Sequence, residues 1–361
     1  MACLIRTDEE LAVHLRDLES CSRISVDTEF HPEKAYFPKI MLLQLRADEG
    51  EVLLVDPLGP VDMTKLGPAL STRTLLMHGG AADLQLLRRH CAATPARVID
   101  TQILAAFAGL GWPRRLQDIV AAVLGREIDK QATLSDWSRR PLSEDQLRYA
   151  SDDVLLLDAL AQGLEARVAA FGNAAFAQAA LSESLTIALA PPDDADLWRR
   201  IPGAHLLGAP ERAALCELAA WREAKARALD NAPGHVVADA MLFDLARRRP
   251  DTLDGFRENR RMPSQVWRQH GQELLAVLAR ATTTAAPRAP RRGADADAVR
   301  LAARISGEAA GVAAEYVCRE CEVDHILDGS AAVGWRVAAL GGPFQDFLVG
   351  NKVIARGGRL V

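Results

Sequence analysis

The first hundred residues contain short apolar runs separated by turn residues, a pattern typical of β-strands. Residues 24–30 alternate β-branched and aromatic side chains with polar ones. Residues 40–45 and 52–56 follow after turn-rich segments, and three runs so closely spaced predict an antiparallel meander. A fourth apolar run, residues 75–78, predicts a shorter buried strand that ends at a pair of glycines.

Apolar positions recur at helical spacing in the segments between and after these strands. The expected helices are residues 8–18, 81–89, 102–107, 116–124 and 143–166. The last of them opens with Ser143-Glu144-Asp145-Gln146, which fits a capping box. A sheet packed with helices makes the fold class α/β for the N-terminal part, which we expect to cover residues 1–190.

The remainder of the chain is expected to form helical modules. A proline-rich, charged stretch ends the α/β part, and residues 205–281 carry helical patterns throughout. Residues 282–298 are too poor in large apolar side chains to fold alone, so they are predicted to be a flexible linker. Residues 299–361 form a last module, which is expected to be helical over 299–321 and is interrupted by glycines toward its end.

Composition agrees with this picture. The chain has 361 residues, of which 49% are hydrophobic and 25% charged, with a net charge of −5, as in ordinary globular proteins of two or three domains. The first residues lack the layout of a signal peptide, and no apolar run approaches the roughly 20 residues that span a bilayer, so we expect a cytoplasmic protein without membrane contact. Six scattered cysteines are typical of reduced thiols, and the pair Cys318 and Cys321 lacks the second pair of ligands that a structural zinc site needs.

Acidic side chains stand at three places that could together form a metal site. On a strand, Asp27 and Glu29 point to the same face, and adjacent carboxylates repel unless water or cations neutralise them. Taken alone, this pair fits a solvated strand end as well as half of a divalent-metal site. Asp83 lies on the helix after the fourth strand, and Tyr149 and Asp153, four residues apart, share one face of a helix. Four carboxylates from three elements could hold two hard cations, the device used for in-line attack on a phosphodiester.

These motifs, in this order and at these separations, resemble the ribonuclease D family, bacterial 3′–5′ exonucleases of the DEDDy type, over residues 1 to about 285. The motifs that carry the resemblance are Asp27-Thr28-Glu29-Phe30, His78 through Asp83-Leu84, and Tyr149 with Asp153. Further matching stretches are Tyr36-Phe37-Pro38, Val55 to Leu58, Ile99 to Phe107, and Lys130 followed by Ser135 to Leu142.

The resemblance implies a ribonuclease H-like exonuclease domain, a mixed sheet with helices, followed by all-α modules. It makes Asp27, Glu29, Asp83 and Asp153 the ligands of two divalent metal ions, Mg²⁺ or Mn²⁺, and Tyr149 the residue that positions the attacking water. The implied activity is that of a metal-dependent 3′–5′ exoribonuclease that releases nucleoside 5′-monophosphates.

The expected partner is RNA with a single-stranded 3′ end, and the implied role is 3′ maturation of tRNA precursors and other small structured RNAs. No protein partner is evident from the sequence. A 3′–5′ exonuclease that acts on DNA and a non-catalytic protein that binds RNA 3′ ends stay open as alternatives. The presence of all four carboxylates and the tyrosine argues against the second.

Two residues beside the motifs are candidate substrate contacts. Phe30 could stack on the terminal base, with core packing as the alternative. His78 could contact the substrate, although a histidine beside a glycine turn is more often structural. We expect Trp137 to pack in the core, and Asp100 and Asp136 to cap helices or support the ligands rather than bind metal.

Residues 205–281 resemble the HRDC domain, a small helical module that provides auxiliary contacts to nucleic acid. The resemblance is carried by Leu215 to Arg227, Val236-Val237, Leu242 to Arg247 and His270 to Leu275. Residues 299–361 resemble a degenerate second HRDC domain, with Gly334-Trp335-Arg336 as its anchor. Basic side chains of the first module could contact phosphates or could line a solvated helix face. They are Arg222, Lys225, Arg227, Arg247, Arg248, Arg249, Arg260 and Arg261.

Overall fold

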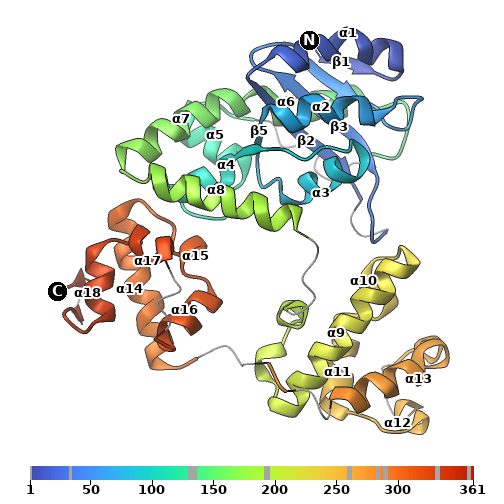
Figure 1. Cartoon of the computed structure of the whole chain (residues 1–361), viewed down its shortest axis with the longest axis vertical. Helices are drawn as coiled ribbons and strands as arrows, with labels where there is room; N and C mark the ends of the chain where they lie inside the picture. The colour runs from blue at the N-terminus through green and yellow to red at the C-terminus, as the bar shows by residue number, and fades with distance from the viewer. Residues whose placement is uncertain are drawn as a thin grey trace. The chain divides into compact units, whose positions relative to one another are not determined.

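The chain forms two compact units (Figure 1). The computed structural model describes residues 2–31, 35–128, 136–190, 196–257, 262–281, 285–287, 292–329, 334–355 and 359–361. The first unit consists of residues 1–30, 39–190 and 291–361, and the second of residues 31–38 and 191–290. Among the described helices, none combines the length and the apolar character that a membrane crossing requires.

A six-stranded mixed sheet forms the centre of the first unit, with the strand order β1-β4-β3-β2-β5-β6. Its strands are β1 (Ala2–Ile5), β2 (Arg23–Phe30), β3 (Ile40–Ala47), β4 (Val52–Val55), β5 (Thr74–Met77) and β6 (Arg97–Asp100). The predicted meander is confirmed, because β2, β3 and β4 pair antiparallel. β5 pairs parallel with β2, β6 with β5, and β1 with β4. The sequence pattern does not predict β1 and β6, each of which has four residues.

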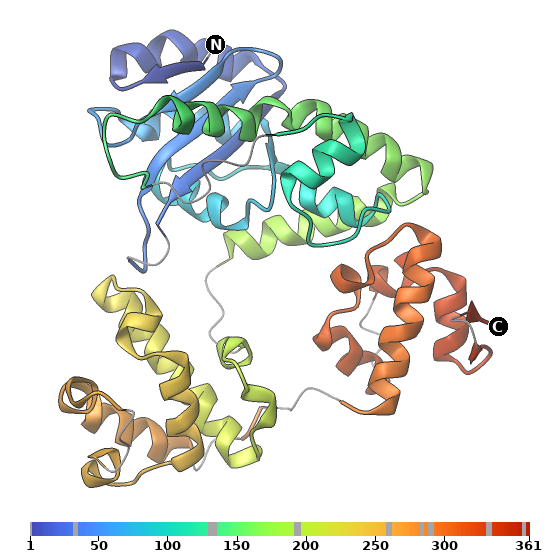
Figure 2. The ribbon, with the colours of Figure 1, turned by 180° about the vertical axis from the view of Figure 1, so that it is seen from behind.

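Helices cover both faces of this sheet. They are α1 (Asp8–Ser20), η1 (Met63–Leu66), α2 (Gly67–Thr72), α3 (Ala81–His90), α4 (Thr101–Ala106), α5 (Leu116–Leu124), α6 (Glu144–Leu155), α7 (Leu157–Ala170) and α8 (Ala174–Leu189). Neighbouring strand residues enter different cores: Leu43 and Leu75 pack with α1, α2 and α3, whereas Leu42 and Leu76 pack with α4 to α7. On the second face, α6 lies against β2, β3 and β4, in front of the strands in Figure 2. The α/β prediction is therefore confirmed as a three-layer arrangement.

The helix predicted over residues 143–166 is in fact two helices, α6 and α7, separated at Leu156. The Arg46 side chain donates a hydrogen bond of 2.7 Å to the carbonyl of Leu155. In a continuous helix that carbonyl would accept from the amide of residue 159. The hydrogen bond at this break comes from a residue that lies 109 positions away in the sequence, so apolar spacing alone does not predict it.

The C-terminal segment belongs to the same unit as the sheet. Its elements are α14 (Ala294–Ala310), α15 (Ala314–Val317), α16 (Glu320–Leu327), α17 (Gly334–Ala339), α18 (Gly342–Leu348), β7 (Ile354–Ala355) and β8 (Arg359–Leu360). It is joined to the end of α4, because the amide of Ala313 donates to the carbonyl of Ala106 at 2.6 Å, and the ring of Tyr316 lies 5.7 Å from that of Phe107.

Two boundaries in this segment differ from the sequence prediction. α14 begins at Ala294, inside the predicted linker 282–298, where acidic residues of its first turn favour a helix N-terminus. Residues 282–284 and 288–291 of that linker lie outside the described residues. The helix predicted over 299–321 is interrupted at Gly311, whose φ of +68° ends α14 in the left-handed conformation.

The second unit is helical, as predicted. Its elements are η2 (Leu197–Arg200), η3 (Ala204–Leu206), α9 (Ala209–Leu229), α10 (Pro233–Val236), α11 (Asp239–Arg248), α12 (Leu253–Arg257) and α13 (Ser264–Ala281). They surround one apolar core that includes Leu215, Leu242 and Leu274. Tyr36 belongs to this unit too, because its hydroxyl donates to Glu223 at 2.7 Å.

Candidate metal centre

Three of the predicted acidic residues converge at one end of β2. Asp27 and Glu29 leave β2 on the face that α6 covers, and Asp153 extends from α6 toward them. One carboxylate oxygen from each of the three residues lies within 4.8 Å of the others. The structure therefore brings together side chains that are more than 120 positions apart in the sequence.

Asp83 reaches this end of the sheet from the opposite layer. It stands in the first turn of α3, is 8% exposed, and its carboxylate accepts a hydrogen bond from the hydroxyl of Thr28. Thr28 lies between the two acidic residues of β2 and points to the α3 side of the sheet. Burial raises the pKa of Asp83, and the Thr28 hydrogen bond acts against that rise. The sequence pattern names Asp83 but gives no role to Thr28.

Asp100 fixes the turn from which α3 begins. Its carboxylate accepts hydrogen bonds from the amides of Gly79 at 2.9 Å and Gly80 at 3.1 Å, and from the amide of Gln102 at the start of α4 at 2.9 Å. Gly79 has a φ of +67°, which a residue with a Cβ adopts only with strain. The prediction that Asp100 is a capping group is thus confirmed, and the cap sets where α3 presents Asp83.

His78 has both ring nitrogens engaged within the protein. Nδ1 lies 2.9 Å from the hydroxyl oxygen of Thr101, and Nε2 lies 3.0 Å from the carbonyl oxygen of Arg114. Burial lowers the pKa of the ring, which favours its neutral form. These contacts favour the structural alternative for His78. Phe30 is half-buried and packs beside the core under α1 to α3, which leaves its substrate contact a prediction.

Tyr149 lies one helical turn before Asp153 and hydrogen-bonds to it. Burial and the nearby carboxylates raise the pKa of the phenol above its ordinary value, so the hydroxyl keeps its proton at neutral pH. The ring of Trp137, which is 4% exposed, lies 6.1 Å from the ring of Tyr149 and supports it from the core. The prediction that Trp137 packs in the core is confirmed.

The acidic residues are electrostatically unsatisfied as a group. Burial, followed by the charges of Asp153 and Asp83, raises the pKa of Asp27 well above its usual range and that of Glu29 to about 8. Burial and the adjacent charge of Asp152 raise the pKa of Asp153 to about 7. Among the described residues, no lysine or arginine forms an ion pair with Asp27, Glu29 or Asp153.

Carboxylates whose pKa values are raised by burial and by one another are suited to bind a divalent cation. Hard cations such as Mg²⁺ and Mn²⁺ take carboxylate oxygens, and their charge offsets the repulsion that raises these pKa values. The cluster of Asp27, Glu29 and Asp153 can therefore hold a metal ion. Asp83 lies close enough for its negative charge to raise the pKa of Asp27.

Three of the basic residues considered for phosphate binding are engaged within the second unit. Arg222 donates to Asp239 at 2.6 Å, Lys225 pairs with Glu273 at 2.9 Å, and Arg227 lies over the ring of Tyr36. These contacts disfavour phosphate binding by the three side chains. Arg260 and Arg261 lie outside the described residues.

Comparisons with known proteins agree with the geometry. The family model described as 3′-5′ exonuclease matches residues 3–169, and that of the HRDC domain matches residues 211–278. Together with the fold and the acidic cluster, this defines the chain as a 3′–5′ exonuclease.

Two relatives and one solved structure identify the family. Ribonuclease D of Escherichia coli is 34% identical over 78% of this chain and 75% of its own length. Ribonuclease D of Acidiphilium cryptum is 31% identical over 99% and 96%. The crystal structure of E. coli RNase D, described as an exoribonuclease involved in structured RNA processing, superposes with a TM-score of 0.75 at 29% identity, covering 91% of this chain and 90% of that one. The chain belongs to the ribonuclease D family.

Proposed function

We propose that this protein is a metal-dependent exoribonuclease that hydrolyses the 3′-terminal phosphodiester bond of RNA and releases nucleoside 5′-monophosphates. The observation that carries the proposal is the convergence of Asp27, Glu29 and Asp153 within 4.8 Å at the end of β2, with Asp83 beside them. A half-buried group of carboxylates with raised pKa values, and without a basic partner among the described residues, is costly unless it binds cations.

We propose Asp27, Glu29, Asp83 and Asp153 as the ligands of two divalent ions, Mg²⁺ or Mn²⁺. When bound, the ions would supply the positive charge that activates a water molecule and stabilises the departing 3′ oxygen. Because Glu29 and Asp153 have pKa values of about 8 and about 7, their loading with metal releases protons near neutral pH.

Tyr149 acts in this proposal by orientation rather than as a base. Its raised pKa keeps the phenol protonated, with the proton directed at Asp153. The hydroxyl oxygen can accept a hydrogen bond from the attacking water but does not remove its proton. The hydrogen bond to Asp153 and the neighbouring ring of Trp137 fix the direction of the hydroxyl. Phe30, next to Glu29, is proposed to stack on the terminal base.

The proposed substrates are tRNA precursors and other small structured RNAs with a single-stranded 3′ end. The support is the family: the relatives are ribonucleases D, and the E. coli protein acts in structured RNA processing. We propose residues 1–190 as the catalytic domain, 205–281 as an HRDC domain that adds RNA contacts, and 282–293 as a linker. Because α14 begins at Ala294, we propose residues 294–361 as a degenerate second HRDC-like domain.

A turnover assay separates this function from the two alternatives. End-labelled single-stranded RNA and DNA of one sequence are incubated with the protein in Mg²⁺, in Mn²⁺ and in EDTA, and the products are separated. We expect stepwise loss of nucleoside 5′-monophosphates from the RNA 3′ end, abolished by EDTA. Preferred cleavage of DNA would support the DNA exonuclease, and binding of RNA without turnover in either metal would support the non-catalytic alternative.

The matched variants for this assay are Asp27→Asn and Asp17→Asn. Asp17 is an exposed residue of α1, so its substitution changes the net charge equally without touching the cluster. Only the Asp27 variant should lose turnover.

A further inference from the structure

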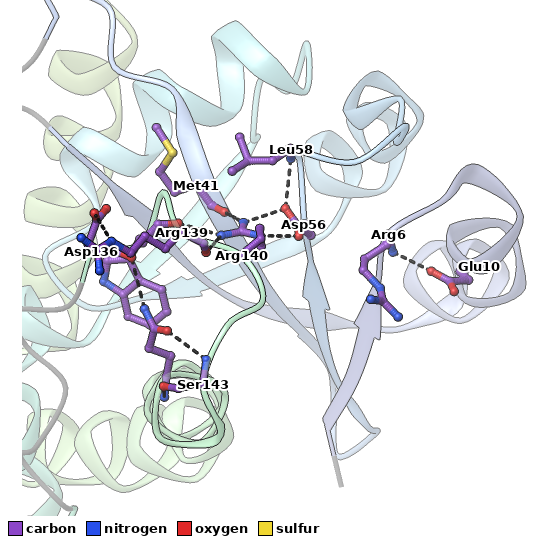
Figure 3. Close-up of polar contacts among 11 residues, drawn as sticks. Arg6, Glu10, Met41, Asp56, Leu58, Asp136, Arg139, Arg140 and Ser143 are labelled. Carbon is purple, nitrogen blue, oxygen red and sulfur yellow. Dashed lines mark hydrogen bonds and ion pairs between the residues drawn. The ribbon is translucent and has the colours of Figure 1, made fainter.

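Arg140 has every side-chain donor occupied by the protein (Figure 3). Nε donates to Oδ2 of Asp56 at 2.5 Å, and Nη2 donates to Oδ1 of Asp56 at 2.7 Å and to the carbonyl of Met41 at 2.6 Å. Nη1 donates to the carbonyls of Trp137 and Arg139, each at 2.8 Å. A guanidinium has five N–H donors, so none is left for a phosphate of the substrate. Arg140 is therefore a structural anchor rather than a substrate-binding arginine.

Asp56 ties this arginine to the sheet. It follows β4 directly, is 3% exposed, and its amide donates to the carbonyl of Ile5 at 2.8 Å. Its Oδ1 also accepts from the amide of Leu58 at 3.0 Å, so each oxygen of the carboxylate has a partner. A bidentate pair of this kind has little freedom to move, because both planar groups are held by further hydrogen bonds.

Arg140 also lies just before the start of α6 in the sequence. Ser143, the N-cap of α6, stands three residues after Arg140 and forms the predicted capping box with Gln146. The side-chain amide of Gln146 donates to the carbonyl of Asp136 at 3.5 Å. Residues 136–143 thus form a short bridge that is bonded to β3 and β4 at one side and to the first turn of α6 at the other.

This bridge also supports Tyr149. Arg140 binds the carbonyl of Trp137, and the Trp137 ring lies against Tyr149, two turns into α6. Asp153 follows one turn later on the same helix. Because a helix is stiff along its axis, a shift of the first turn of α6 displaces Tyr149 and Asp153 together. Both side chains then move relative to the ligands on β2. Mg²⁺ tolerates little displacement, since it requires nearly ideal octahedral geometry.

We propose that the Asp56–Arg140 pair is a positioning device that sets the place of α6 against the sheet and thereby the alignment of Asp153 and Tyr149 with the ligands on β2. The proposal rests on the function proposed above. Neither residue touches the reacting atoms. Loss of the pair should weaken metal binding by about 10-fold to 100-fold, the range seen when groups that orient metal ligands are removed.

The experiment measures Mn²⁺ affinity of the full-length protein by titration, following the electron paramagnetic resonance signal of free Mn²⁺. Four variants are compared with the unmodified chain: Arg140→Gln, Arg140→Lys, Asp56→Asn and the double variant Asp56→Asn with Arg140→Gln. Arg139→Gln is the control, because the side chain of Arg139 is 84% exposed and forms its ion pair with Asp136 at the surface. Circular dichroism and thermal melting report whether each variant is folded.

The expected result is weaker Mn²⁺ binding in each single variant and a double variant no weaker than the more affected single one, because both substitutions remove the same contact. Arg140→Lys should restore little, since a lysine cannot form the planar two-point contact. At saturating metal, kcat should fall while KM for RNA stays within about twofold. The control should bind Mn²⁺ like the unmodified chain.

Unchanged Mn²⁺ affinity in folded Arg140→Gln or Asp56→Asn would overturn the proposal, even if these variants melt at lower temperature, because a purely stabilising pair leaves the affinity of the folded site intact. A rise in KM alone would also overturn it and would indicate contact with RNA. If Arg140→Gln does not fold, Arg140→Lys and Asp56→Asn decide by the same criterion. Absence of Mn²⁺ binding in the unmodified chain would instead contradict the proposed function.

Discussion

Glu29 provides the sharpest stability test, because its carboxylate is destabilising until a cation binds. Burial and the charges of Asp153 and Asp83 raise its pKa from 4.5 to about 8. The folded, metal-free protein therefore holds this proton more tightly than the unfolded chain. The resulting contribution to stability is fully present below pH 4.5 and is lost as the pH rises through about 8. Above that pH the ionised side chain opposes folding.

The magnitude follows from the same values. One pKa unit corresponds to about 1.4 kcal/mol, so the rise from 4.5 to about 8 sets an upper bound of about 5 kcal/mol on the penalty at pH 9. Glu29→Gln removes the charge. The new side-chain amide costs about 1–3 kcal/mol of folding free energy if its hydrogen bonds are unsatisfied. We expect the variant in EDTA to be more stable than the unmodified chain by about 2 kcal/mol at pH 9, with the difference vanishing or reversing at pH 5.

The assay is urea denaturation at pH 5, 7 and 9, with EDTA and then with Mn²⁺. Glu49→Gln is the control, because Glu49 is an exposed carboxylate of the β3–β4 turn. Mn²⁺ should stabilise the unmodified chain at pH 9 and should stabilise Glu29→Gln much less. A variant that shows no gain in stability at pH 9, or a gain that does not depend on pH, would refute the electrostatic reasoning.

Three further substitutions test other parts of the account. Tyr149→Phe should keep the fold and Mn²⁺ affinity but lower kcat about 100-fold, since it removes only the orienting hydroxyl; an unchanged kcat in single-turnover RNA cleavage would remove Tyr149 from the reaction. Asp27→Asn should lose both turnover and the stabilisation by metal, and full activity with added Mg²⁺ would contradict its role as a ligand. Gly311→Ala should destabilise the protein by about 1–3 kcal/mol more than Gly329→Ala in urea denaturation. Both glycines have a φ of +68°, but only at Gly311 would a Cβ overlap the ring of Phe171, so equal losses would contradict the packing of the C-terminal segment.

Features that depend on neighbouring residues could be predicted from the sequence. The alternation in β2 places Asp27 and Glu29 on one face, and the spacing of Tyr149 and Asp153 puts them on one side of α6. The capping box at Ser143 is equally local and is present as predicted. Such patterns are reliable because they express the geometry of a single strand or helix turn.

Features that depend on distant residues could not be predicted in this way. Arg46 binds the carbonyl of Leu155 where α6 ends, and Thr28 on β2 binds Asp83 on α3. Asp56 and Arg140 both lie in stretches typical of the family, yet 84 positions separate them and nothing in either stretch identifies the other as its partner. Contacts of this kind are set by how the layers pack, which the apolar pattern specifies only coarsely.

The central claim is that carboxylates from β2, α3 and α6 hold two divalent ions at one site. Anomalous diffraction from crystals of this protein grown with Mn²⁺ tests it most directly. We expect one manganese peak at coordination distance from Asp27, Glu29 and Asp153, and a second about 4 Å away whose ligands include an oxygen of one of these side chains or of Asp83. Manganese bound elsewhere, with these carboxylates bound only to water or to protein groups, would contradict the account.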